Sequence, residues 1–179
     1  MDNEQQIIES TQYWLDKLVI GLNLCPFARY VVDRQQLRYS LVTTGDTEVL
    51  LDTLIDELKR LDQNAAIETT LLIHPNLLQD FEDFLAFLEQ VDGLLEDMGY
   101  EGIYQVASFH PDYQFAGTSS QDPANHTNRS PYPMLHILRE ESVSQAIDSH
   151  PDIDSVPEAN IERLRTLGIE SIKAMLSKH

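Results

Sequence analysis

The stretch Thr69-Thr-Leu-Leu-Ile-His-Pro75 is the part of the sequence that most directly predicts the fold. Three of its first five residues are β-branched, which is typical of a buried strand in a parallel sheet. Proline ends the strand because it cannot continue the hydrogen-bond ladder. Apolar residues recur at helical spacing on both sides, over residues 51–61 and 77–95. The sequence therefore predicts a strand with one helix before it and another after it.

Further strands and helices continue this alternation in both directions. Residues 37–43 alternate in polarity as an edge strand does, and residues 103–109 form a third predicted strand. A helix from about Glu4 precedes them and breaks at Pro26, and residues 30–32 are a candidate fourth strand. After the third strand we predict a helix that begins near Ser130, followed by two helices at the C-terminal end of the chain.

This order of elements predicts a single α/β domain over residues 1–179. Strands that alternate with helices of this length are joined by right-handed crossovers in a small, mostly parallel sheet with flanking helices. An α+β, ferredoxin-like mixed sheet is the alternative. One domain of this size buries enough surface to need no disulfide, and the single cysteine, Cys25, fits a reducing compartment.

The chain is strongly acidic. It has 30 Asp and Glu residues against 12 Lys and Arg residues, for a formal net charge of −18. This charge repels phosphate backbones and anionic lipids, so we expect neither nucleic acid nor a membrane as a partner. The polar N-terminus has no signal peptide, and the most apolar stretch, residues 18–28, is shorter than the about 20 residues of a membrane span. These features predict a cytoplasmic protein.

Two predicted strands end in the same dipeptide, His74-Pro75 and His110-Pro111. If the strands are parallel neighbours, both histidines lie at the carboxyl edge of the sheet, where open α/β sheets bind ligands. The two histidines are therefore acid–base candidates, and together with Asp112 they are candidate ligands of a divalent metal. The metal signal is weak, because no closely spaced histidine or cysteine pair is present. The alternative is that His-Pro only ends each strand.

Residues 110–131 are predicted to form a long loop without regular structure, a type of segment that often binds ligands. Near its end Arg129 offers a planar guanidinium for a carboxylate or phosphate, and Asn128 offers an amide for the same ligand. The alternative is that Arg129 pairs with one of the acidic residues of the chain.

The helix predicted from Ser130 places a third histidine, His136, one turn inside it. Because that helix has to pack back on the sheet, we expect Arg129, His110 and His136 to face one cleft. Tyr113 and Tyr132 are predicted to line this cleft beside the ligand. His136 is therefore the third acid–base candidate.

Four strings in this chain resemble a bacterial family, and the likeness covers most of the chain up to about Val143. The strings are Gly-Leu-Asn-Leu-Cys-Pro-Phe-Ala (21–28), Leu-Leu-Ile-His-Pro (71–75), Ser-Phe-His-Pro-Asp-Tyr-Gln-Phe-Ala-Gly (108–117) and Thr-Asn-Arg-Ser-Pro-Tyr-Pro-Met-Leu-His-Ile-Leu-Arg-Glu (127–140). The family is the domain of unknown function 1415, and the resemblance implies membership of that family without assigning an activity. It also implies that tyrosine is usual at the position of His126, which argues against a role for that histidine as ligand or catalyst.

Two functions are compatible with these patterns. The first is binding or transformation of a small anionic molecule at the carboxyl edge of the sheet, which favours an enzyme but predicts no reaction class. The alternative is a non-catalytic protein-interaction module with the long loop as its docking surface. Cys25 is predicted to be an unreactive packing residue, because lone cysteines among apolar neighbours are usually buried.

Overall fold

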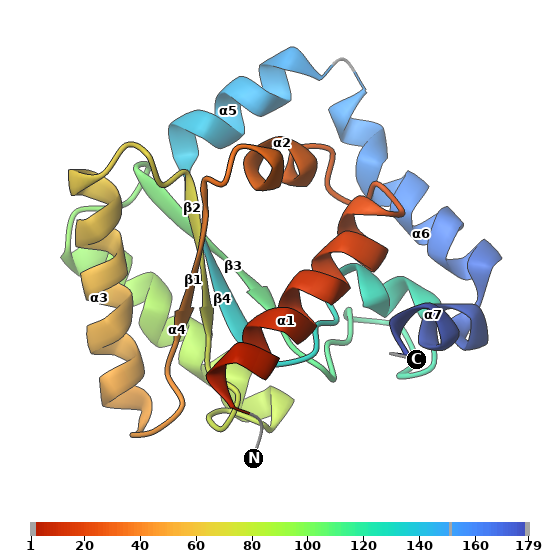
Figure 1. Cartoon of the computed structure of the whole chain (residues 1–179), viewed down its shortest axis with the longest axis horizontal. Coiled ribbons are helices and arrows are strands. Elements are labelled where there is room, and N and C mark those ends of the chain that lie inside the picture. Colours follow the sequence, from red (N-terminus) through yellow and green to blue (C-terminus); the bar gives the residue numbers. More distant parts are fainter. Residues whose placement is uncertain (1–2, 151, 178–179) are drawn as a thin grey trace.

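A four-stranded sheet forms the centre of the computed structural model, which describes residues 3–150 and 152–177. The strand order is β1-β2-β4-β3, and the strands are β1 (Leu37–Leu41), β2 (Thr69–Ile73), β3 (Tyr104–Phe109) and β4 (Met134–Arg139). β1 and β2 are parallel, whereas β4 is antiparallel to both of its neighbours. Helices lie on both faces of the sheet (Figure 1). The α/β class is confirmed, and the prediction of a mostly parallel sheet is wrong.

The sheet is mixed rather than mostly parallel because of β4, which occupies residues that were predicted to form a helix. Its side chains alternate between the two faces, with Leu135 and Ile137 in one core and Met134 in the other. β4 also lies between β2 and β3. The prediction that those two strands are neighbours is therefore wrong. The order β-α-β-α-β-β differs from the β-α-β-β-α-β order of the ferredoxin-like alternative, although the sheet is mixed.

One face of the sheet packs against two long amphipathic helices. These are α3 (Thr47–Gln63) and α4 (Phe81–Asp97), and each is capped by an aspartate side chain, Asp46 and Asp80. Fully buried leucines of α3 and phenylalanines of α4 contact Leu72, Leu135 and Ile137 of the sheet. The predicted helices on either side of β2 are thus confirmed, but the second begins after residue 80 rather than near residue 76.

The opposite face packs against helices from both ends of the chain, as Figure 1 shows. They are α1 (Glu4–Trp14), the π-helical segment η1 (Leu15–Ile20), α2 (Ala28–Asp33), α6 (Val156–Leu167) and α7 (Ile169–Leu176). Their apolar side chains contact Leu71, Ile73 and Met134 of the sheet. α2 includes residues 30–32, so the candidate strand there is wrong.

The remaining elements are α5 (Glu140–Ser149) and two short 3-10 helices, η2 (Pro123–Thr127) and η3 (Ile153–Ser155). α5 continues directly from β4 and has no fully buried residue. Within residues 3–150 and 152–177, no helix has both the length and the apolar character needed to cross a bilayer.

The junction after η1 requires a glycine. The backbone N–H of Gly21 donates to the carbonyl of Asp16, five residues earlier, at 2.9 Å. A Cβ atom on Gly21 would lie 2.3 Å from the Lys17 carbonyl oxygen, closer than any ordinary contact. The chain then turns through Asn23, whose φ of 51° is left-handed, and the side-chain amide of Asn160 donates to the Leu24 carbonyl at 2.7 Å. The turn therefore joins the first helix to α6.

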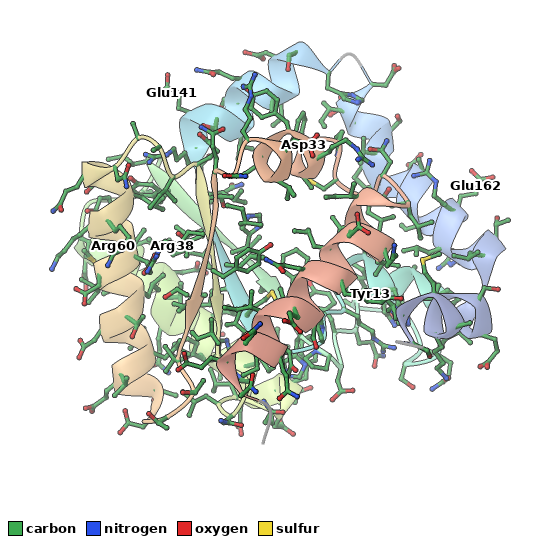
Figure 2. All side chains as sticks on the ribbon, viewed as in Figure 1. Tyr13, Asp33, Arg38, Arg60, Glu141 and Glu162 are labelled. Atoms are coloured by element: carbon green, nitrogen blue, oxygen red, sulfur yellow. The ribbon has the colours of Figure 1, made fainter. Side chains whose placement is uncertain are left out.

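Glu57 of α3 is a buried carboxylate that two arginines neutralise. The guanidinium of Arg38 on β1 donates to both of its oxygens, at 2.8 and 3.0 Å, and Arg60 forms an ion pair with it at 3.5 Å. Figure 2 labels both arginines, which lie close to each other beside α3. Only 3% of Glu57 is exposed, so these contacts hold α3 against β1 within the structure.

Candidate functional site

His74 and His110 lie at the same edge of the sheet and on the same face, where β2 and β3 end. Both rings pack against Phe84 of α4, with ring centroids 5.8 and 5.1 Å from it. β4 separates their strands, and neither histidine has any exposed surface. The prediction that they share the carboxyl edge is confirmed, but their side chains belong to the core under α4.

The hydrogen bonds of these two rings fix their neutral tautomers. Nε2 of His110 donates to the Leu78 carbonyl at 3.1 Å, because its Nδ1 accepts from the backbone N–H of Asp112 at 3.0 Å. Nδ1 of His74 donates to the Leu77 carbonyl at 3.0 Å, and its Nε2 has no partner among the described residues. Leu78 has a left-handed φ of 53°, so the histidines secure a strained turn before α4.

Burial keeps both rings neutral. Desolvation lowers the pKa of His74 to about 4, and it also lowers the pKa of His110, where Asp112 and Asp80 partly oppose the effect. Asp112 itself is exposed, and its backbone rather than its carboxylate contacts His110. No three acidic, histidine or cysteine side chains converge as metal ligands within the described ranges, so His74, His110 and Asp112 form no such group.

His136 lies on the opposite face of the sheet from His110. It pairs with Leu71 and Ala107 in register, and its ring lies 6.1 Å from that of Phe109 in the core beneath α1. Burial lowers its pKa to about 4, although its side chain keeps partial exposure. The expectation that His110 and His136 face one cleft is therefore wrong, because β4 is a strand and the sheet stands between them.

The loop from residue 110 to 131 is well ordered by its own polar groups. Asn125 of η2 is fully buried, and its side-chain oxygen accepts from the Phe115 backbone and from the Thr118 hydroxyl, at 3.0 and 2.9 Å. Asn128 donates its amide to the Ser108 carbonyl at 3.1 Å, which ties the loop to β3. The amide of Asn128, predicted to bind substrate, is thus occupied within the protein.

The guanidinium of Arg129 donates hydrogen bonds to two backbone carbonyls of the loop. Nε donates to the Tyr113 carbonyl and Nη2 to the Ser120 carbonyl, both at 2.9 Å. These bonds use two of the five N–H donors of an arginine. No carboxylate forms an ion pair with Arg129 anywhere in residues 3–150 and 152–177, although Asp112 is near enough to raise its pKa against the larger effect of burial. The alternative of an ion pair is not observed, and the half-buried charge has no direct counter-ion in the part of the chain that the structure describes.

His126 is the functional candidate that the sequence analysis set aside. It lies in η2, which packs against α6, and only 9% of its surface is exposed. Neither ring nitrogen has a hydrogen-bond partner in the described part of the chain. Desolvation first, and then the charges of Arg129 and Lys173, lower its pKa to about 4. Only an isolated histidine in a polar loop marks this position in the sequence, so no pattern could have identified it.

Tyr113 and Tyr132 do not line one pocket. Tyr113 packs against Phe81 of α4 and Phe115 of the loop, at ring distances of 5.3 and 5.0 Å. Tyr132 packs on the other side of the sheet, in the core beneath α1. Cys25 is half-buried in the same core and follows η1 in the turn before α2.

Two hollows in the described surface lie away from all of these residues. One, of about 480 Å³, lies on the outer side of α6, where Figure 2 shows Glu162 pointing away from the sheet. The other, of about 380 Å³, lies near the start of β3 and includes four carboxylates, those of Asp92, Glu96, Glu101 and Glu140. Neither holds a candidate acid–base or anion-binding group from the sequence analysis.

The family model described as "Protein of unknown function (DUF1415)" matches residues 6–174, nearly the whole chain. No curated protein and no solved structure matches the chain.

Proposed function

Since the chain belongs to the DUF1415 family, whose function is unknown, its activity has to be inferred from its own side chains, and we propose that it binds a small anionic molecule at Arg129. The observation that carries this proposal is the half-buried guanidinium, which is held by two carbonyl oxygens and has no carboxylate partner among the described residues. Three N–H donors remain for a ligand, and a charge-assisted pair of hydrogen bonds to an arginine contributes about 1.5–3 kcal/mol.

The place of this site is the carboxyl edge of β3. Asn128 ties the loop to Ser108 of that strand, and the indole of Trp14 donates to the Arg129 carbonyl at 2.9 Å. Because backbone and side chain are both held, the guanidinium is pre-organised and loses little conformational entropy when it binds an anion. The Arg129 guanidinium would give an anionic ligand a local positive charge to bind on a protein that is acidic elsewhere.

The proposal is binding rather than a particular reaction. His74 and His110 have no exposed surface in the core under α4, and His136 lies on the opposite face of the sheet, so the three acid–base candidates do not share one cleft. Arg129 and the loop that it organises therefore carry the proposed function without a catalytic partner.

The test is titration of the protein with sulfate, inorganic phosphate, acetate and succinate by calorimetry, comparing wild type with Arg129→Lys. Lysine keeps the charge but cannot hold both carbonyls, so we expect affinity to fall about tenfold or more. Arg163→Lys is the matched control, because Arg163 also donates to backbone carbonyls, of Leu22 and Asn23, but is exposed. Absence of binding for every anion, or equal affinity in wild type and Arg129→Lys, would reject the proposal.

A second candidate function is the interaction module. Neither α2 nor α5 has a fully buried residue, and Tyr30 and Ile147 on these helices are 56% and 46% exposed. The ring of Phe27, just before α2, packs on His150 after α5, so the two helices meet at these ends. Sedimentation at rising protein concentration tests this idea for a second copy: a dimer that Tyr30→Ser abolishes supports it, and a monomer throughout argues against self-association.

A further inference from the structure

His126 is a buried histidine whose two ring nitrogens have no hydrogen-bond partner in the described part of the chain. A neutral imidazole has one N–H donor and one acceptor, and a buried polar atom without a partner costs about 1–3 kcal/mol. Both ring nitrogens of His126 are in this state, in a side chain that is nine-tenths buried. Neighbouring polar groups, by contrast, are satisfied: Asn125 makes three side-chain hydrogen bonds. The His126 ring is therefore the buried side chain of this loop whose polar atoms have no hydrogen-bond partner among the described residues.

Two positive charges act on the His126 imidazole, those of Arg129 and Lys173. Arg129 follows His126 closely in the chain, and its backbone N–H donates to the Asn125 carbonyl, so both side chains leave the same turn. Lys173 of α7 is near enough to act on the imidazole electrostatically. In a chain with 12 lysines and arginines, two of them therefore act electrostatically on one buried histidine.

Each acidic group near this cluster acts on a cation rather than on the His126 ring. Asp122, the N-cap residue of η2, pairs with Arg165 of α6 at 2.7 Å, and Glu170 pairs with Lys173 at 3.6 Å on the exposed side of α7. Asp112 acts on Arg129 but forms no ion pair with it. No carboxylate contacts the His126 ring within the described residues, so an imidazolium there would have no direct counter-ion among them.

We propose that Arg129, His126 and Lys173 together bind a dianionic oxyanion group, of the sulfate or phosphate class, and that His126 takes up a proton as the anion binds. This inference rests on the proposed function and names the ligand chemistry of the same site. As an imidazolium, His126 gains a second donor, and both nitrogens can then donate to oxygens of the anion. The two nearby cations that now oppose protonation are neutralised by the ligand.

The charge balance favours a dianion over a monoanion. Arg129, Lys173 and an imidazolium at His126 carry three positive charges, so among possible ligands a monoanion compensates one of them and a dianion compensates two. A tetrahedral oxyanion also presents oxygens in several directions, while a planar carboxylate presents two in one plane. Sulfate is the sharper probe, because it stays fully ionised near neutral pH and any proton taken up has to come to the protein.

The experiment is calorimetric titration with sulfate at pH 7 in two buffers that differ in ionisation enthalpy, repeated at pH 6 and pH 5. We expect net proton uptake and an affinity that rises as pH falls, by at most tenfold per pH unit. His126→Gln should abolish the uptake and the pH dependence of binding, while the control His136→Gln should leave both unchanged. Acetate should bind more weakly than sulfate.

The outcomes separate the two proposals. Sulfate binding that depends on Arg129 but involves no proton uptake overturns the inference and retains the proposed function. Absence of any anion binding overturns both. If His126→Gln does not fold, the imidazole signals of His126 in the wild type decide by NMR, because its pKa has to rise when sulfate is added and an unchanged pKa overturns the inference.

Discussion

Replacing Gly21 by alanine tests the π-helical junction most directly. The new Cβ would lie 2.3 Å from the Lys17 carbonyl oxygen and 3.0 Å from that of Asp16. Ordinary carbon–oxygen contacts are about 3.3 Å or longer, so the backbone has to move by roughly 1 Å. That movement disturbs the Gly21 N–H bond to Asp16 and, through the following turn, the Asn160 bond to Leu24.

The expected cost follows from two opposing effects. Forcing an extra carbon into a filled space costs about 1–3 kcal/mol, whereas alanine favours helical backbone over glycine by up to about 1 kcal/mol. We therefore expect Gly21→Ala to lower the free energy of unfolding by about 1–2 kcal/mol, which urea denaturation at pH 7 can resolve.

Gly93→Ala is the matched control. Gly93 lies inside α4, and a Cβ there would meet no atom within 4 Å. The same substitution should therefore stabilise the protein by up to about 1 kcal/mol at Gly93 and destabilise it at Gly21. If both variants gain stability, the close contact at Lys17 does not constrain the junction and the reasoning fails.

Three further predictions concern charge, acid and the thiol. Arg38→Ala leaves the buried Glu57 carboxylate with Arg60 as its remaining ion-pair partner among the described residues, so urea denaturation should show a loss of about 3 kcal/mol, against less than about 1 kcal/mol for the exposed Arg60→Ala. The pKa values of His74, His126 and His136 are about 4 in the folded protein, below the ordinary 6.5, so the unfolded chain binds more protons between these values. Their stabilising effect, present above pH 6.5, should be lost as pH falls toward 4, by up to about 1.4 kcal/mol per pH unit each, and His136→Gln should flatten this slope in denaturation at pH 7, 6 and 5. Cys25 should react slowly with a thiol reagent in native protein and quickly in urea; equal rates would contradict its packing in the core.

The parts of the fold that sequence could predict are those with one dominant period. The residues of α3 and α4 repeat at helical spacing, and residues 69–73 form a compact buried strand, so their structures are confirmed. β4 has two competing patterns: Leu135 and Leu138 are three residues apart as on a helix, while Leu135 and Ile137 alternate as on a strand. Only the available space between β2 and β3 decides between them, and that space is a property of the whole fold.

The candidate site shows the same limit. That His74 and His110 share an edge follows from the direction of their strands, which sequence spacing indicated. The partners of Arg129 are the backbone carbonyls of Tyr113 and Ser120, and a carbonyl is present at every residue, so no side-chain pattern could reveal them. His126 is a single histidine among polar residues in the sequence, a pattern that predicts an exposed loop, so its burial against α6 could not be predicted.

The central position of β4 has a consequence for how the chain acquires its structure. β3 pairs with β4, and β2 touches β3 only through β4, so the sheet cannot be completed until residues 134–139 are available. A chain leaving the ribosome can pair β1 with β2 early, but β3 must wait for the strand that follows its long loop. Such late, distant pairing slows folding and leaves strand edges open meanwhile. Completion of the sheet should thus coincide with ordering of the loop that carries Arg129, so that the native core and the candidate site form in the same step.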